Sequence, residues 1–312
     1  MERITVIGAG NVGATVANVL AHKDLAKEVI LVDIKDGIAQ GKALDIWQSA
    51  AVEDFSTKVI GVTDDYEKTA GSGIVIVTSG LPRKPGMSRD DLIKTNAIIV
   101  KEVCEKAVKY SPNAIFIIVS NPLDVMTYAA LKATKLDSKK VIGMAGILDT
   151  ARFSMFVAEA LNVSPRTVNT LLLGGHGDTM VPLPNHSTVG GVPLKTLLPA
   201  DKLNAIVERT KKGGGELVNL MGTSAWFAPG AAAVLMAESI VRDQKRVFPC
   251  CVLLKGEYGL KDVYLGVPVS LGKEGVERVI EMKLDEEETK NLHDSCNAVK
   301  TVMNVLDEMK LF

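Results

Sequence analysis

Six short runs of apolar, mostly β-branched residues recur along the first half of the chain, and they limit the folds it can adopt. Within each run the apolar residues occupy successive positions, as in parallel strands that are buried on both faces. Stretches with helical periodicity separate the runs; one of them places Val12, Val16, Val19 and Leu20 on one face. This alternation predicts an α/β fold built on a doubly wound parallel sheet. The expected strands are 3–8, 28–33, 58–63, 74–79, 114–120 and 141–146.

The pattern changes after about residue 147, where helical and strand-like stretches no longer alternate regularly. We expect mixed α and β structure there, and two domains in all: 1–146, the parallel α/β domain, and 147–312, a mixed α+β domain that completes a site at the edge of the first. The elements expected in the second domain are helices over 149–162, about 200–222, about 229–245 and at the C-terminus, a strand pair near 187–194 and a β-meander over 248–271.

Composition excludes several classes of function. The formal net charge is −1, which gives no electrostatic reason to propose nucleic acid or an anionic membrane as a partner. No apolar run reaches the roughly 18 residues of a membrane span, and strand-type sequence at residue 3 leaves no room for a signal peptide. The four cysteines show no C-x-x-C spacing and are expected to be reduced. These features predict a soluble cytoplasmic protein, and no metal site is predicted.

The segment "GAGNVG" matches G-x-G-x-x-G, between the first expected strand and the following helix. Gly8 permits the turn, Gly10 lets the backbone approach a pyrophosphate, and Gly13 allows close packing of helix on sheet. Asp33 ends the second strand twenty residues after Gly13, where its carboxylate can bind ribose hydroxyls and repel a 2′-phosphate. A Rossmann-type domain that binds NAD rather than NADP is therefore predicted. Its expected cofactor residues here are Gly8, Ala9, Gly10, Asn11, Val12, Gly13 and Asp33.

A second glycine run, Gly213–Gly215, has no preceding strand and no G-K-[ST] ending. We expect a helix break or a site of close backbone packing there, not a phosphate loop.

Hydride transfer to or from a small acid requires a group that exchanges the hydroxyl proton. Of the four histidines, His22 and His293 lie in helical patterns with charged neighbours, and His186 is ambiguous. His176, in "LLLGGHGDT", is flanked by glycines at the end of an apolar strand, which would expose its ring. Its ordinary pKa lies close to neutral pH, so we expect His176 to be the acid–base group.

Three more polar residues are candidates for the same site. Asp149 and Arg152 are three apart in a predicted helix and share a face, so they form either an ordinary ion pair or a His176 partner and a carboxylate clamp. Spacing alone leaves these two interpretations open. Asn121 follows the fifth strand at its carboxyl end, where open α/β sheets bind ligands, although Asn-Pro is also a common turn.

The segment "LPRKPGMSRDDL", residues 81–92, holds the cations Arg83, Lys84 and Arg89 together with two prolines and a glycine. In isolation it would be a solvated loop. Next to a nucleotide-binding sheet, we expect it to be a lid that brings arginines onto a substrate and excludes water. Ser88 is the expected N-cap of the following helix, with Asp91 completing a capping box.

Together, "GAGNVG", "SGLPRKPGMSRDDL", "VSNPLDV", "GILDTAR" and "GGHGDTMVPL" resemble, in order and spacing, the lactate/malate dehydrogenase family. The match runs from Gly8 to the C-terminal helix, and it is most similar to the lactate-dehydrogenase-like branch of the malate dehydrogenases. The resemblance implies that His176 accepts the proton, with Asp149 as its partner. It also implies a tetramer, which is favoured over a dimer. The other roles it implies are carboxylate binding by Arg152, carbonyl polarisation by Arg89, contact with substrate and cofactor by Asn121, and contact with the nicotinamide half of NAD by Asn96, Val119 and Ser120.

The resemblance also bears on the substrate. Arg83 stands where lactate dehydrogenases of this family usually carry Gln, and a second carboxylate on the substrate would pair with it. We expect the tricarboxylic-acid-cycle reaction, in which (S)-malate and NAD⁺ give oxaloacetate, NADH and a proton. The alternatives are a lactate or other 2-hydroxy-acid dehydrogenase, or an NAD-binding protein that has lost the chemistry.

Overall fold

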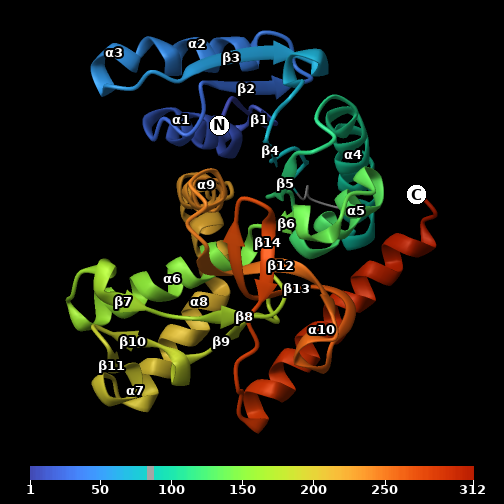
Figure 1. Ribbon diagram of the computed structural model, residues 1–312. Coiled ribbons are helices and arrows are strands. Elements are labelled where there is room, and N and C mark those ends of the chain that lie inside the picture. The colour runs from blue at the N-terminus through green and yellow to red at the C-terminus, as the bar shows by residue number, and fades with distance from the viewer. Residues whose placement is uncertain (83–87) are drawn as a thin grey trace.

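A nine-stranded sheet forms the centre of the computed structural model, which describes residues 1–82 and 88–312 (Figure 1). The strand order is β14-β13-β12-β6-β5-β4-β1-β2-β3. All six predicted strands of the first half are present and pair in parallel: β1 (Arg3–Ile7), β2 (Glu28–Asp33), β3 (Lys58–Thr63), β4 (Ile74–Val77), β5 (Ile115–Ile118) and β6 (Val141–Gly143).

Helices cover both faces of the parallel strands, as the continuous apolar runs predicted. Residues of α1 (Asn11–His22), α2 (Ile38–Gln48) and α9 (Phe227–Val241) belong to the core on one face. Residues of α4 (Arg89–Tyr110) and α5 (Leu123–Thr134) belong to the core on the other. The short helix α3 (Ala50–Glu53) follows α2. Because β-strand side chains alternate in direction, Ile4 and Val6 enter the first core while Ile7 enters the second.

The β-meander of the second half is longer than predicted, and it extends the same sheet. It consists of β12 (Arg246–Lys255), β13 (Lys261–Gly272) and β14 (Gly275–Val279). These strands pair antiparallel, and β12 joins β6 through the pair Cys251 and Gly143. The sheet therefore continues from the cofactor half of the chain into the other half without a gap.

Helices and two small sheets surround this antiparallel part (Figure 1). The helices are α6 (Ala145–Leu161), α7 (Leu194–Leu197), α8 (Ala200–Met221) and α10 (Glu286–Glu308). The small sheets consist of β7 (Val168–Asn169) with β10 (Thr188–Val189) and β11 (Val192–Pro193), and of β8 (Leu172–Leu173) with β9 (Val181–Pro182). The predicted strand pair near 187–194 is thus present. The last helix buries the predicted face: Leu292, Cys296, Val299, Met303 and Leu306.

Several boundaries differ from the predictions; for example, β4 ends at Val77 and not at residue 79. Helix α6 begins at Ala145, four residues before the predicted start at 149, so residue 146 lies in its first turn. The run 141–146 is apolar throughout, and such a run does not distinguish a strand from the start of a buried helix. Gly213–Gly215 lies inside an uninterrupted α8, so the predicted helix break is wrong. Packing of α8 outweighs the roughly 1 kcal/mol that each glycine costs a helix.

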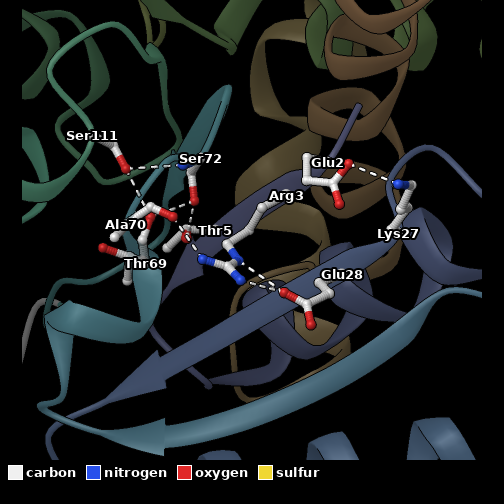
Figure 2. A network of polar contacts seen from close by, with 9 residues as sticks. All are labelled: Glu2, Arg3, Thr5, Lys27, Glu28, Thr69, Ala70, Ser72 and Ser111. Carbon is white, nitrogen blue, oxygen red and sulfur yellow. Dashed lines mark hydrogen bonds and ion pairs between the residues drawn. The ribbon is translucent and has the colours of Figure 1, made fainter.

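Polar contacts fasten the amino-terminal edge of the parallel sheet, opposite the edge that carries the glycine turn (Figure 2). Arg3 donates from Nε to Glu28 on β2 at 3.0 Å and from its guanidinium to the carbonyl of Ala70 at 2.6 Å. The hydroxyls of Thr5 and Ser72 lie 2.8 Å apart in the interior. These contacts tie β1 to its neighbours, and the carboxyl edge is left to the functional side chains.

Within the part of the chain that the structure describes, no helix is long and apolar enough to cross a membrane.

Candidate active site

The glycine turn after β1 forms an open cradle at the carboxyl edge of the sheet. Gly8 has φ +102°, which favours glycine, and a Cβ on Gly13 would lie 1.7 Å from the Gly8 carbonyl oxygen. A Cβ on Gly10 would meet nothing within 4 Å, so the turn is open on that side. Helix α1 starts here without a side-chain N-cap, which leaves N–H groups for an anion.

The carboxylate of Asp33 lies against this cradle. It accepts hydrogen bonds from the N–H groups of Ala9, at 2.7 Å, and Lys35, at 2.9 Å. Lys42 of α2 donates from Nζ to the Ala9 carbonyl at 2.7 Å. Asp33 therefore supports the turn itself, in addition to its predicted contact with a ribose. The contribution of Lys42 was not foreseen, since nothing in the helical pattern separates it from the other lysines of the chain.

His176 and Asp149 form a close pair at the same edge of the sheet. His176 Nδ1 lies 2.7 Å from Asp149 Oδ2, and Arg152 donates to Asp149 Oδ1 at 3.1 Å. The Asp149 side chain is only 1% exposed, whereas Arg152 and His176 are 14% and 17% exposed. Both interpretations of the Asp149–Arg152 spacing have a counterpart in the structure, because one buried carboxylate contacts the guanidinium and the imidazole. Carboxylate binding by Arg152 stays a prediction. With Nδ1 bonded to Asp149, Nε2 of His176 is the nitrogen left for a substrate.

Three elements hold the backbone that carries His176. Gly174, with φ +88°, exchanges two backbone hydrogen bonds with Gly266 of β13. The N–H of Gly175 donates to Ser295 Oγ of α10 at 2.9 Å. The N–H of His176 donates to the carboxylate of Asp124 on α5 at 2.8 Å. The backbone at His176 is therefore held in place from both halves of the chain.

The glycines of α8 lie against Arg152. A Cβ on Gly213 would stand 3.2 Å from Arg152 Cδ, and one on Gly214 would stand 3.9 Å from its terminal nitrogens. A Cβ on Gly215 would meet nothing within 4 Å. The expectation of close backbone packing is thus confirmed at Gly213. Among the described residues, the buried Nε of Arg152 has no hydrogen-bond partner, as expected of a donor kept for an anionic ligand.

The end of β5 contributes a polar corner. Asn121 is exposed there, before a cis peptide bond to Pro122. Asn96 of α4 is 1% exposed; its amide donates to the carbonyls of Asn121, at 2.6 Å, and Leu81, at 3.1 Å, and accepts from the Leu81 N–H at 2.8 Å. Asn96 thereby fixes both backbones, and its contact with the nicotinamide stays a prediction.

Val119 and Ser120 are buried beside this corner, and Ser120 donates to the Ser79 carbonyl at 2.5 Å. Their contact with the cofactor also stays a prediction.

Part of the predicted lid lies outside the described residues, including Arg83 and Lys84. Arg89 is the first residue of α4. The predicted capping box before it is confirmed, since the Ser88 hydroxyl accepts from the Asp91 N–H at 3.0 Å and the Ser88 N–H donates to the Asp91 carboxylate at 3.2 Å.

The remaining histidines lie in other surroundings. His186 pairs through Nε2 with Glu288 of α10 at 3.1 Å. His22 caps the carbonyl of Asn18 within α1, and His293 contacts the carbonyl of Tyr258. The expectation that His176 is the histidine of the site agrees with this arrangement.

Comparison with known proteins identifies the family of this chain. Residues 2–143 match the model of the lactate/malate dehydrogenase NAD binding domain, and residues 147–309 match that of the lactate/malate dehydrogenase alpha/beta C-terminal domain. The chain belongs to the lactate/malate dehydrogenase family. The predicted fold class and NAD as the cofactor are thereby confirmed.

The relatives cover nearly the whole chain. A malate dehydrogenase of Cytophaga hutchinsonii is 63% identical over 305 residues, which is 98% of each chain. The solved malate dehydrogenase of Salinibacter ruber is 52% identical, covers 99% of this chain and 98% of its own, and has a TM-score of 0.95. A lactate dehydrogenase of Cryptosporidium parvum, solved with lactic acid and nicotinamide adenine dinucleotide, is 42% identical over 98% of each chain, with a TM-score of 0.94. Fold similarity alone therefore does not choose between the two substrates.

The features of the cradle fit the NAD of this family. The uncapped start of α1 and the open side of Gly10 suit a pyrophosphate, and Asp33 suits an unphosphorylated ribose. That the turn Gly8–Gly13 binds the phosphates and Asp33 the adenosine ribose stays a prediction.

Charges around His176 tune its basicity. Burial lowers the pKa of His176, but the negative charge and hydrogen bond of Asp149, together with the charge of Asp124, outweigh this effect. Arg152 acts in the opposite direction, and the net result is a pKa above the ordinary value. A histidine in these surroundings readily holds the proton that leaves a substrate hydroxyl.

The sequence reasoning missed Asp124. Its signal was present in "SNPLDV", where an acidic residue stands in the first turn of α5, a mostly apolar helix. That position was open to an ordinary explanation, because an acidic residue in the first turn favours any helix.

Proposed function

We propose that this protein is an NAD-dependent malate dehydrogenase that interconverts (S)-malate and oxaloacetate within the tricarboxylic acid cycle. The observation that carries the proposal is the Asp149 carboxylate shared by His176, at 2.7 Å, and Arg152, at 3.1 Å, at the carboxyl edge of an NAD-binding sheet. The family supports the reaction class, and relatives named malate dehydrogenase support the substrate.

Each residue of this group has a defined task in the oxidation of malate. Arg152 binds the carboxylate next to the hydroxyl through its two-pronged guanidinium. His176 Nε2 accepts the hydroxyl proton, and Asp149 stabilises the resulting imidazolium through Nδ1. The chemistry supplied by NAD⁺ is acceptance of the hydride from the carbon that carries this hydroxyl. In the reverse direction the imidazolium returns the proton to the carbonyl oxygen of oxaloacetate.

Two further residues are assigned by family resemblance. Asn121, exposed at the end of β5, donates to a substrate oxygen and contacts the cofactor. Arg89 polarises the substrate carbonyl, an interaction that strengthens as negative charge develops on the oxygen.

Arg83 is the proposed selector of the dicarboxylate. A charge-assisted hydrogen bond contributes about 1.5–3 kcal/mol, and closing an unpaired guanidinium over pyruvate would cost a similar amount. Both effects favour oxaloacetate over pyruvate. The main rival is a lactate dehydrogenase, because a lactate dehydrogenase shares the fold at a TM-score of 0.94.

The test is NADH oxidation with oxaloacetate and with pyruvate, measured for the unmodified protein and for Arg83→Gln. We expect a strong preference for oxaloacetate, and a fall in the ratio of the two kcat/KM values by roughly 10²- to 10⁴-fold in Arg83→Gln. Lys84→Gln is the matched control, since it removes the neighbouring cation of the same segment and should leave the ratio unchanged. A preference for pyruvate in the unmodified protein would instead establish a lactate dehydrogenase.

We also propose a homo-oligomer, with a tetramer favoured over a dimer, in the cytoplasm. Exposed apolar side chains on α2 and α3 support self-association: Leu44, Trp47 and Val52 are 55%, 45% and 83% exposed. The four cysteines are free and buried, which suits a reducing compartment. Light scattering on the purified protein would give its mass in solution.

A further inference from the structure

Asp124 is a buried carboxylate directly behind the catalytic histidine. It is the second residue of α5 and is 8% exposed. Oδ2 accepts a hydrogen bond from the backbone N–H of His176 at 2.8 Å, and Oδ1 accepts one from the Cys251 thiol at 3.2 Å. Asp124 and His176 also line the same small cavity, between α5 and α10. The carboxylate therefore connects the catalytic loop to α5 and to the central strand β12.

Burial of the Asp124 carboxylate costs free energy, and packing alone does not explain why this group is buried. Removing a carboxylate from water costs several kcal/mol, and a thiol is a weak donor. Burial raises the pKa of Asp124, and the largest opposing effect is the positive charge of His176, followed by the bond from the His176 N–H. The anionic form of Asp124 and the cationic form of His176 thus stabilise each other.

We propose that Asp124 is a positioning residue for the reaction: it fixes the main chain of His176 and places a second negative charge behind the imidazolium. This inference rests on the proposed dehydrogenase activity. It assigns to Asp124 a task distinct from that of Asp149, which touches the ring itself.

The second negative charge is needed because Asp149 also forms an ion pair with Arg152. From α6, Asp149 favours the imidazolium while the nearby guanidinium of Arg152 disfavours it. From α5, Asp124 favours the imidazolium. Asp178 borders the cavity beside His176, and the Cys251 thiol approaches Asp124 from β12. The negative charge of Asp124 therefore offsets the effect of Arg152, the cation proposed to bind the substrate carboxylate, on the imidazolium of His176.

Removal of the charge should move the pH profiles of both directions of the reaction. Reduction of oxaloacetate requires protonated His176, so its rate falls as pH rises through the pKa of His176. Oxidation of malate requires neutral His176, so its rate rises through the same pKa. Without the negative charge of Asp124, the imidazolium is less stable and this pKa falls. Both limbs of the pH profiles should then move to lower pH.

Asp124→Asn tests this inference, because it keeps the shape and removes the charge. We measure kcat/KM for oxaloacetate reduction and for malate oxidation between about pH 5 and 10. A shift of both limbs by about one pH unit is expected, which lowers reduction roughly tenfold on its alkaline limb and moves the midpoint of the oxidation profile to lower pH. Equal loss in both directions at every pH, with unmoved limbs, would overturn the inference and leave a purely structural role.

Ser295→Ala is the matched control. It removes another anchor of the same segment, the acceptor of the Gly175 N–H, without any change of charge. It should lower both directions together and leave the limbs in place. If Asp124→Asn does not fold, as judged by NADH fluorescence titration, Asp124→Ser carries the same test with a smaller uncharged side chain. If the unmodified protein turns over neither oxaloacetate nor malate, the proposed function is refuted instead.

Discussion

Substitution of Gly213 and of Gly215 by alanine, in the same helix, distinguishes an effect on helix stability from an effect on substrate binding. Gly213 is buried in the interior of α8, where its missing side chain lets the backbone approach Arg152. Gly215 lies two residues further along the same helix, is exposed, and has open space where a Cβ would stand. The two positions therefore offer the same substitution with and without contact to the carboxylate clamp.

The structure gives the size of each effect. Alanine in place of glycine stabilises a helix interior by about 1 kcal/mol, so Gly215→Ala should raise Tm by on the order of 2 °C. In Gly213→Ala the new Cβ would stand 3.2 Å from Arg152 Cδ, so the arginine must move by a few tenths of an ångström. A charge-assisted bond contributes about 1.5–3 kcal/mol, and loss of about 1 kcal/mol of it corresponds to a roughly fivefold weaker interaction.

Steady-state kinetics and thermal unfolding of both variants supply the assay. We expect Gly213→Ala to raise KM for oxaloacetate about fivefold with a smaller change in kcat, because ground-state and transition-state binding of the carboxylate are weakened alike. Gly215→Ala should keep the unmodified KM and gain stability. Equal KM values in the two variants would refute the view that the α8 backbone positions Arg152.

Two other substitutions address the proton-transfer group and the cofactor. His176→Asn should nearly abolish turnover while NADH binding, followed by fluorescence, is retained; substantial remaining turnover would remove His176 from the mechanism. Asp33→Asn keeps the size of the side chain that accepts the Ala9 N–H and removes its charge. Discrimination against NADPH, measured as the ratio of kcat/KM for the two cofactors, should therefore narrow by about tenfold or more, and an unchanged ratio would exclude Asp33 as the ribose selector.

The sequence was sufficient for the parallel sheet because strands buried on both faces are apolar at every position, as in β4 with Ile74–Val77. The capping box of Ser88 and Asp91 was predictable for a similar reason, since it depends on residues three apart. Features of this local kind can be predicted without knowledge of the rest of the fold. The approach of His176 to Asp149 was an expectation from chemistry and resemblance, and its geometry needed the structure.

Features that depend on distant segments could not be foreseen. Asp124 and Cys251 are far apart in the chain, and only the pairing of β12 with β6 brings the thiol to the carboxylate. Gly213 and Arg152 meet because α6 packs on α8, and no periodicity within either helix indicates that contact. The unbroken course of α8 through three glycines likewise reflects packing and not propensity.

The pairing of β12 with β6 has a mechanical consequence. Because one hydrogen-bonded sheet runs from β3 to β14, the half that carries the glycine turn and the half that carries His176 cannot hinge apart without breaking the pairing of β6 with β12. The sheet thereby sets how far the glycine turn lies from His176. Adjustment to different acids is left to side chains and to the connections at the carboxyl edge. A change of substrate preference therefore does not require the glycine turn and His176 to change their relative position.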